Sequence, residues 1–220
     1  MDQIDNLRRV DPGYRVPKGK ISFSRTEIWH IAIALLVLAL AFTLILYRAG
    51  NVLYLDTVTN ILALLAISSV LVFCSFILHE FGHKFVAQRF NAWSEFRIFP
   101  QGLVIALVFS LMGFLFAAPG AVYIKGQIDK VMNGKISLAG PGVNFVISAI
   151  ALVACFLVEP GGITYFIIAS LAYLNAFLGL FNMIPVLPFD GSKIVAWDIR
   201  IYLMAAAVGA VELAVYFLYV

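Results

Sequence analysis

The sequence predicts an all-α polytopic membrane protein with about six membrane segments. Hydrophobic residues make up 63% of the 220-residue chain, whereas charged residues make up only 12%. Apolar runs long enough to cross a bilayer follow one another, separated by short polar turns. A further apolar stretch, 103–124, is interrupted by glycine and proline and is flanked by basic residues. This composition excludes a water-soluble globular domain.

The N-terminal segment, residues 1–27, is polar and carries six basic side chains ahead of the first apolar run. It lacks the short apolar core and the small-residue cleavage site of a signal peptide. Because basic residues stay on the cytoplasmic side, we expect 1–27 to be a cytoplasmic segment. An arm that binds DNA or lipid is the alternative, but a topology signal explains the charge more simply. The membrane-embedded domain is then 28–220, with its core at 57–200.

The long apolar runs define the predicted spans. Ser24 and Glu27 have the spacing of a capping box immediately before the first run. In the fourth segment, Asn144 follows a group of small residues and can hydrogen-bond across the bundle, so we expect it to serve packing. By length and composition the long spans are 28–47, a helix from Thr57 through His79, 136–158, 163–184 and 201–220.

The stretch 103–124 decides the topology of every later segment. A single crossing would separate Lys125 and Lys130 from Lys84 across the membrane and would invert the spans that follow. A re-entrant or two-pass hairpin with a reversal near Gly113 keeps these basic residues on one side. Its turning backbone needs partners from protein or from a water-filled cavity. We therefore predict a hairpin beside the zinc site that packs on the second and fifth spans.

The second span contains the sequence His79-Glu80-Phe81-Gly82-His83, which reads H-E-x-x-H. Residues four apart share one face of a helix, so His79 and His83 can hold one metal ion between them. Imidazole pairs suit zinc, with a third protein ligand and an open position for water. Glu80 is offset by one residue and is the candidate acid/base. Two merely hydrogen-bonded histidines are the simpler alternative, but ionisable residues at membrane depth favour function.

The fifth span ends in a segment with two prolines, Pro185 and Pro188, which end or kink the helix. Asp190 follows them. A carboxylate at membrane depth is costly unless something pairs with it, and a metal ion is a natural partner. With the hairpin topology, Asp190 reaches the same side as the histidines and completes a site for one Zn²⁺ per chain. The alternatives are that Asp190 caps the next helix, or that Glu159 or Glu212 is the third ligand.

These residues resemble the site-2 protease family of intramembrane zinc metalloproteases. The resemblance spans about 57–200 and rests on the H-E-x-x-H sequence, on Asn182 to Pro185 followed by Pro188, Asp190 and Gly191, and on Ala139-Gly140-Pro141. It implies that His79, His83 and Asp190 bind zinc and that Glu80 is the catalytic acid/base. It also implies that Asn182 helps to position the substrate or its polarised carbonyl.

The resemblance further implies a zinc metalloendopeptidase that cuts in or near the transmembrane helix of a membrane-anchored substrate, in regulated intramembrane proteolysis. The expected partners are that substrate and the lipid bilayer, with no nucleic acid; the sequence leaves the oligomeric state open. We expect a multi-pass protein of the cell membrane, with its N-terminus in the cytoplasm and its site near the cytoplasmic face. The competing interpretation is a non-catalytic membrane protein that binds or transports zinc.

Overall fold

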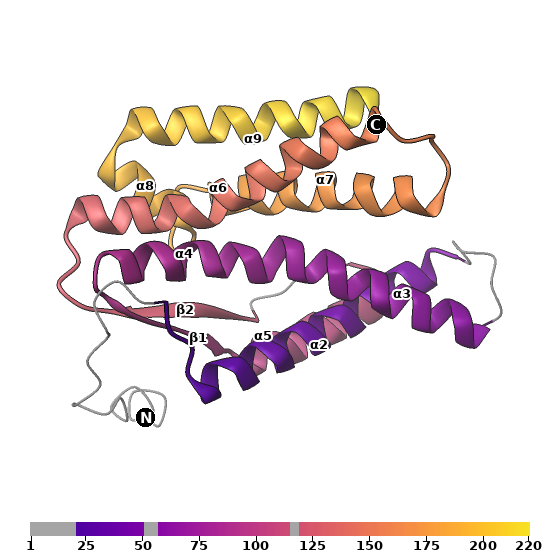
Figure 1. Ribbon diagram of the computed structural model, residues 1–220, viewed down its shortest axis with the longest axis horizontal. Coiled ribbons are helices and arrows are strands. Elements are labelled where there is room, and N and C mark those ends of the chain that lie inside the picture. The colour runs from indigo at the N-terminus through magenta and orange to yellow at the C-terminus, as the bar shows by residue number, and fades with distance from the viewer. Residues whose placement is uncertain (1–20, 51–56, 115–118) are drawn as a thin grey trace.

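The computed structural model describes residues 21–50, 57–114 and 119–220. Figure 1 shows helices that run roughly side by side, with a short two-stranded ribbon at one end of the bundle. The elements are α2 (Arg25–Arg48), α3 (Thr57–Val72), the π-helical turn η1 (Phe73–Ile77), α4 (Leu78–Arg89), β1 (Trp93–Ile98), α5 (Pro100–Leu111), β2 (Gly120–Lys125), α6 (Lys130–Cys155), α7 (Ile163–Asn182), α8 (Asp190–Trp197) and α9 (Ile199–Tyr219).

The predicted fold class is confirmed. Within the described residues, five helices are long and apolar enough to cross a membrane, and α3, η1 and α4 form one of them. The predicted spans correspond to α2, the α3–α4 helix, α6, α7 and α9. Helix α6 begins at Lys130, earlier than predicted, because the Asp129 carboxylate caps it by accepting from the Met132 N–H at 2.7 Å. The short helix α8 was not predicted from the sequence.

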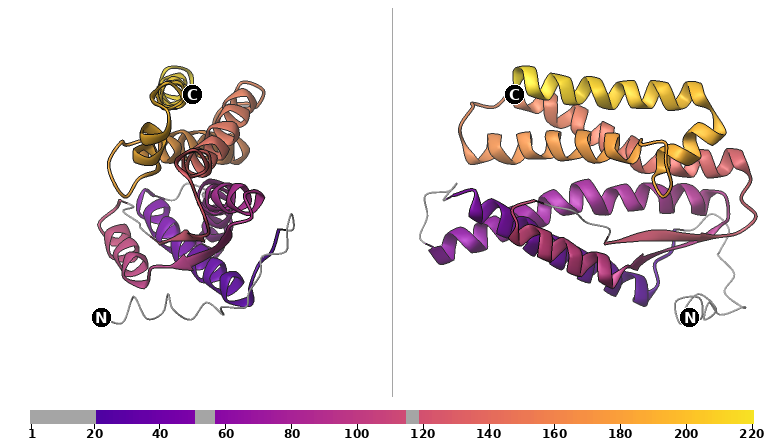
Figure 2. Two further views of the ribbon diagram at one scale, coloured as in Figure 1. Left: turned by 90° about the vertical axis from the view of Figure 1, so that its left-hand side faces the viewer. Right: turned by 180° about the vertical axis from the view of Figure 1, so that it is seen from behind.

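Helix α4 lies in the middle of the molecule. Figures 1 and 2 show α6, α7, α8 and α9 on one side of it, and α2, α5 and the strands on the other. On α4, Gly82 lies so close to α6 that a methyl group there would sit 2.7 Å from the Ala139 carbonyl oxygen. The small residues at the start of the predicted fourth span therefore let two helices meet closely, as expected.

The stretch 103–124 turns back on itself, as predicted. Helix α5 forms its first half, Gly113 has a φ of +93° in the turn that follows, and β2 forms part of the return. Strand β2 pairs antiparallel with β1, from Trp93 opposite Lys125 to Ile98 opposite Gly120. The chain therefore comes back to the end of the bundle from which it left. In the described residues β2 packs on α4 of the second span, but the predicted packing on the fifth span is wrong, because the apolar side chains of α5 join a cluster with α2 and α3. The ribbon itself was not predicted at β1, because Trp93–Ile98 finds its partner more than twenty residues away.

The start of α2 is only half of a capping box. The Ser24 hydroxyl accepts from the Glu27 N–H at 3.1 Å, but the Glu27 carboxylate pairs instead with Lys84 and with the Phe96 N–H, each at 2.9 Å. Lys84 was expected among the basic residues that flank the second span, yet it is completely buried. Of the predicted segment 1–27, residues 1–20 lie outside the described part of the chain.

Candidate metal centre

Three predicted ligands meet in one buried cluster. The Nε2 atoms of His79 and His83 are 3.0 Å apart, one helical turn apart on α4. The Asp190 Oδ2 atom lies 3.6 Å from His79 Nε2 and 3.0 Å from His83 Nε2. All three residues are buried, with exposed fractions of 3%, 8% and 7% for His79, His83 and Asp190. In the described residues these are the three His, Cys, Asp or Glu side chains that converge closely enough to hold a metal ion.

Asp190 reaches the histidines because α7 ends at Asn182 and the proline-containing turn carries the chain back to α4. Asp190 opens α8, and its carboxylate faces the imidazoles rather than serving only as a cap. Its second oxygen, Oδ1, accepts from the Lys193 ammonium group at 3.2 Å, one turn along α8. A carboxylate is ordinarily ionised at neutral pH, so Asp190 can act as a ligand.

Each imidazole is oriented through its other nitrogen. His79 Nδ1 lies 2.5 Å from the Asn144 Oδ1 atom, and His83 Nδ1 lies 2.8 Å from the Ile136 carbonyl oxygen. Both partners are oxygens that can only accept, so each ring donates from Nδ1. The Nε2 lone pairs then point into the cluster with Asp190. This arrangement is typical of zinc-binding histidines, whose ring orientation is set by such partners.

Asn144 is itself held by a chain of hydrogen bonds across the bundle. Its amide donates to the Ser75 carbonyl in η1 at 2.8 Å and to the Asn175 Oδ1 of α7 at 2.7 Å. Asn175 in turn donates to the Leu171 carbonyl at 2.9 Å. The predicted interhelical hydrogen bonding of Asn144 is confirmed, but its contact with His79 was missed. The sequence does place an asparagine in each of two apolar spans, Asn144 and Asn175, but their spacing does not indicate that they meet.

Gly140 of α6 forms the wall of the cluster. A Cβ atom added there would overlap the His83 ring and would lie 2.7 Å from His79 Nε2. Only a residue without a side chain leaves the two imidazoles in place. Two imidazole nitrogens and one carboxylate oxygen form a donor set that suits zinc, and the partners on Nδ1 leave the correct nitrogens available. The residues present therefore fit a zinc ion.

The two predicted catalytic residues differ in their surroundings. Glu80 is buried, one residue from His79, and its Oε2 accepts from the Val122 N–H of β2 at 2.9 Å. Asn182 closes α7, where its amide donates to the Leu178 carbonyl of its own helix at 2.9 Å. The alternative ligands lie elsewhere: Glu159 is exposed in the turn after α6, and Glu212 is on α9. Neither belongs to the described metal-binding group.

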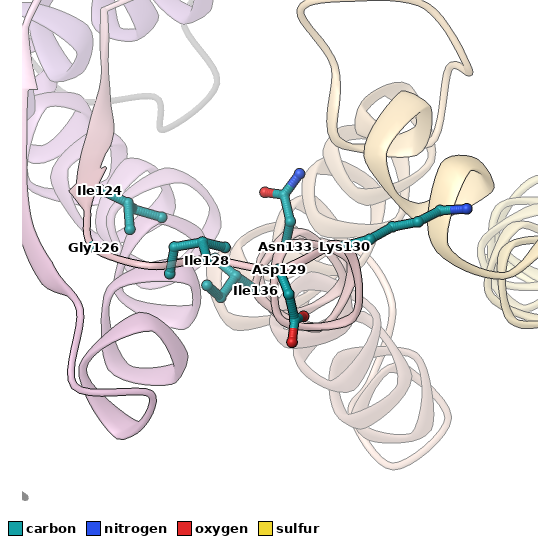
Figure 3. Close-up of a pocket in the computed structure, with 7 residues that line it drawn as sticks. All are labelled: Ile124, Gly126, Ile128, Asp129, Lys130, Asn133 and Ile136. Atoms are coloured by element: carbon teal, nitrogen blue, oxygen red, sulfur yellow. The ribbon is translucent and has the colours of Figure 1, made fainter.

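A separate hollow of about 510 Å³ lies at the junction of β2 and α6 (Figure 3). Figure 3 shows the side chain of Asp129, which caps α6, the side chain of Asn133 on α6, and that of Ile124 from β2. Ile136 lines the hollow, and its carbonyl group holds the His83 ring. The cluster of histidines and Asp190 is not part of its lining. The hollow therefore borders the centre without containing it.

Fold and site together define a multi-pass membrane protein with a buried centre of two histidines and one aspartate. Over 178 residues the chain is 37% identical to "Putative zinc metalloprotease MJ0611" of Methanocaldococcus jannaschii, which covers 80% of this chain and 86% of that protein. It is 30% identical over 129 residues to "Zinc metalloprotease MJ0392" of the same organism, covering 59% of this chain and 33% of that one. The chain belongs to this family of zinc metalloproteases. No protein-family model matches the chain, and no solved structure matches it.

Proposed function

We propose that this protein is an intramembrane zinc metalloprotease of the site-2 protease type. Its substrate would be a membrane-anchored protein, cut in or near its transmembrane helix in regulated proteolysis. The observation that carries the proposal is the burial of His79, His83 and Asp190 around one point, with two of them on a helix of membrane-spanning length. A hydrolytic centre in that position can act on peptide bonds that never leave the membrane region.

The roles follow from the contacts of each side chain. His79, His83 and Asp190 would hold zinc, which when bound supplies a Lewis acid that polarises a carbonyl group and makes water more acidic. Glu80 would accept the proton of the attacking water and return it to the leaving amine. Its Oε2 is engaged by Val122, which leaves Oε1 for the proton. Asn182, half-buried at the end of α7, would help to position the substrate carbonyl.

Strand β2 offers a way to hold an extended substrate. Because β1 pairs with one edge of β2, alternate backbone groups of β2 point to the other edge, toward α4. The Val122 N–H on that edge is taken by Glu80, so an added strand would pair with the groups on either side of it. A helical substrate hides its carbonyl groups and must therefore unwind first. Pairing with β2 would stabilise the unwound segment beside Glu80.

We also propose that the site lies near the cytoplasmic face of the cell membrane, with the N-terminus in the cytoplasm. Basic residues occur where α4 ends and where α6 begins, and the β1–β2 pairing brings these two points to one end of the bundle. Single cysteines at Arg89 and Lys130, both exposed, should be labelled from the cytoplasmic side, and one at Glu159 from the outside. Opposite labelling of Arg89 and Lys130 would refute this topology. Lys84 is unsuitable for labelling because it is buried.

The proposed reaction is tested with zinc-loaded protein in liposomes and a panel of membrane-anchored substrates. Wild type should cut at least one substrate within or beside its transmembrane helix. Glu80→Gln should retain zinc and lose activity by about 100- to 10,000-fold, the usual worth of a general acid/base. Glu159→Gln, which alters an exposed carboxylate, should cut like wild type. If wild type cuts no substrate, and wild type and Glu80→Gln bind zinc equally, the result would instead favour a non-catalytic protein that binds or transports zinc.

A further inference from the structure

A buried ion pair that the proposed reaction does not use connects three elements, α2, α4 and β1. Glu27 at the start of α2 and Lys84 of α4 are both 0% exposed, and Lys84 Nζ lies 2.9 Å from Glu27 Oε2. The same ammonium group donates to the Ser94 carbonyl of β1 at 2.8 Å, and it lies 4.7 Å from the centre of the Phe23 ring. Lys84 therefore ties the metal-binding helix to the first strand of the ribbon.

The other oxygen of Glu27 holds the ribbon at a specific point. Glu27 Oε1 accepts from the Phe96 N–H at 2.9 Å, and Phe96 stands opposite Val122 in the ribbon. The Val122 N–H is bonded to Glu80 on the opposite edge. In an antiparallel pair of this kind both N–H groups point outward, away from the partner strand. One cross-strand pair is thus gripped from both edges, by Glu27 on one side and by Glu80 on the other.

Helix α4 carries both the residues that bond to the ribbon and two of the predicted metal ligands. Glu80 and Lys84 are four residues apart and share one face of α4, while His79 and His83 share the next. A shift of the ribbon relative to α4 would move the Val122 amide away from Glu80 without touching the histidines. A buried ion pair contributes little net stability, because desolvation offsets its attraction. The consequence of this pair is therefore mainly geometric.

We propose that Glu27 and Lys84 are positioning residues that hold the Val122 amide in register with Glu80, and so orient the catalytic carboxylate. This inference rests on the proposed function for the role of Glu80, but the clamp itself is a property of the fold. Removal of the ion pair should therefore lower turnover and leave zinc binding unchanged. A merely stabilising ion pair would instead affect unfolding and leave the turnover of folded protein unchanged.

The test uses a neutral replacement of the pair. In Glu27→Gln/Lys84→Met, the glutamine still accepts from the Phe96 N–H and methionine fills the space of the lysine stem, so no buried charge is left alone. For a substrate that wild type cuts, kcat should fall by about 10- to 100-fold, as small displacements of catalytic groups do. KM and zinc content should stay close to wild type. The kcat of Lys84→Arg should lie between those of the neutral variant and wild type. Wild-type kcat in the folded neutral variant would overturn the proposal.

A second background shows whether the pair acts through Val122. Val122→Pro removes the outward N–H without removing a bond of the β1–β2 ladder. If the ion pair works through this amide, adding Glu27→Gln/Lys84→Met to Val122→Pro should lower kcat no further. Ile124→Pro is the matched control, since its amide is on the same edge two residues along. There the two effects on kcat should multiply. Multiplied effects in both backgrounds would contradict the proposed route.

Amide exchange tests the clamp independently of activity. In protein labelled with [15N]valine, the Val122 amide should exchange slowly in wild type, and faster in both Glu80→Ala and Glu27→Gln/Lys84→Met. If wild type cuts no substrate, the proposed function fails, while faster exchange in both variants still supports the clamp. Exchange of Val122 that is as slow in Glu27→Gln/Lys84→Met as in wild type overturns the clamp, whatever the enzyme cuts.

Discussion

The two faces of α4 are held in different ways. The ligand face, with His79 and His83, is oriented by a side-chain amide and a backbone carbonyl of α6 and faces Asp190 of α8. The neighbouring face, with Glu80 and Lys84, is held by the backbone of a two-stranded ribbon. Packed helices thus surround the predicted ligands, whereas the proposed base is bonded to a backbone amide of the ribbon. Changes on the first face should therefore appear in zinc binding, and changes on the second in turnover.

The strongest effect on the ligand face is expected at Gly140. In Gly140→Ala the new methyl group overlaps the His83 ring, so the imidazoles cannot keep their positions. Zinc affinity should fall by about 100-fold or more, at or beyond the upper end of what contacts around a metal site usually cost. Gly142→Ala is the matched control, because a Cβ there meets nothing within 4 Å. Competition with a fluorescent zinc chelator measures both. Equal affinity of the two variants would show that α6 does not form the wall of the centre.

A smaller loss of zinc is expected at Asn144. Asn144→Leu removes the partner of His79 Nδ1 and leaves that ring free to turn, which should weaken zinc binding by about 10- to 100-fold. Asn182→Leu provides the contrast: its amide bonds within α7, so zinc affinity should stay unchanged while turnover falls if Asn182 positions the substrate. The same chelator titration, combined with kcat, separates the two asparagines. A loss of zinc in Asn182→Leu, with none in Asn144→Leu, would reverse their roles.

The smallest effect is expected at Lys193. Its ammonium group contacts the outer oxygen of Asp190, but its side chain is 37% exposed, so water screens the interaction. Lys193→Met should change zinc affinity by less than about 1 kcal/mol, or about fivefold. Lys193→Arg should bind zinc like wild type. A change as large as that in Asn144→Leu would mean that Lys193 determines how Asp190 is held.

Local patterns explain which features could be predicted from the sequence. Apolar run lengths located the spans, and the placement of lysines predicted the hairpin. The spacing in H-E-x-x-H put two nitrogen donors on one face of a helix. Two of the missed features depend on a distant partner. Lys84 has the sequence context of a basic flank, but it pairs with Glu27, which lies 57 residues away. Asn144 bonds to Asn175, 31 residues further on.

The π-helical turn η1 was missed for another reason. Phe73–Ile77 is as apolar as the helix before it, so neither composition nor periodicity distinguishes it from α-helix. It lies just before His79, and its Ser75 carbonyl accepts from Asn144 at 2.8 Å. Turns of this kind often occur at functional sites. Here the turn gives α6 a backbone acceptor beside the ligand helix, which links helix geometry to the orientation of His79.

The most direct test of the two-faced helix is the zinc content of purified Glu80→Gln beside Asp190→Asn. Both changes replace one buried carboxylate by an amide of similar size, so they form a matched pair. The proposed roles predict that Glu80→Gln copurifies with as much zinc as wild type, while Asp190→Asn loses most of it. Zinc-free Glu80→Gln, or fully loaded Asp190→Asn, would contradict the assignment of ligands and base to separate residues.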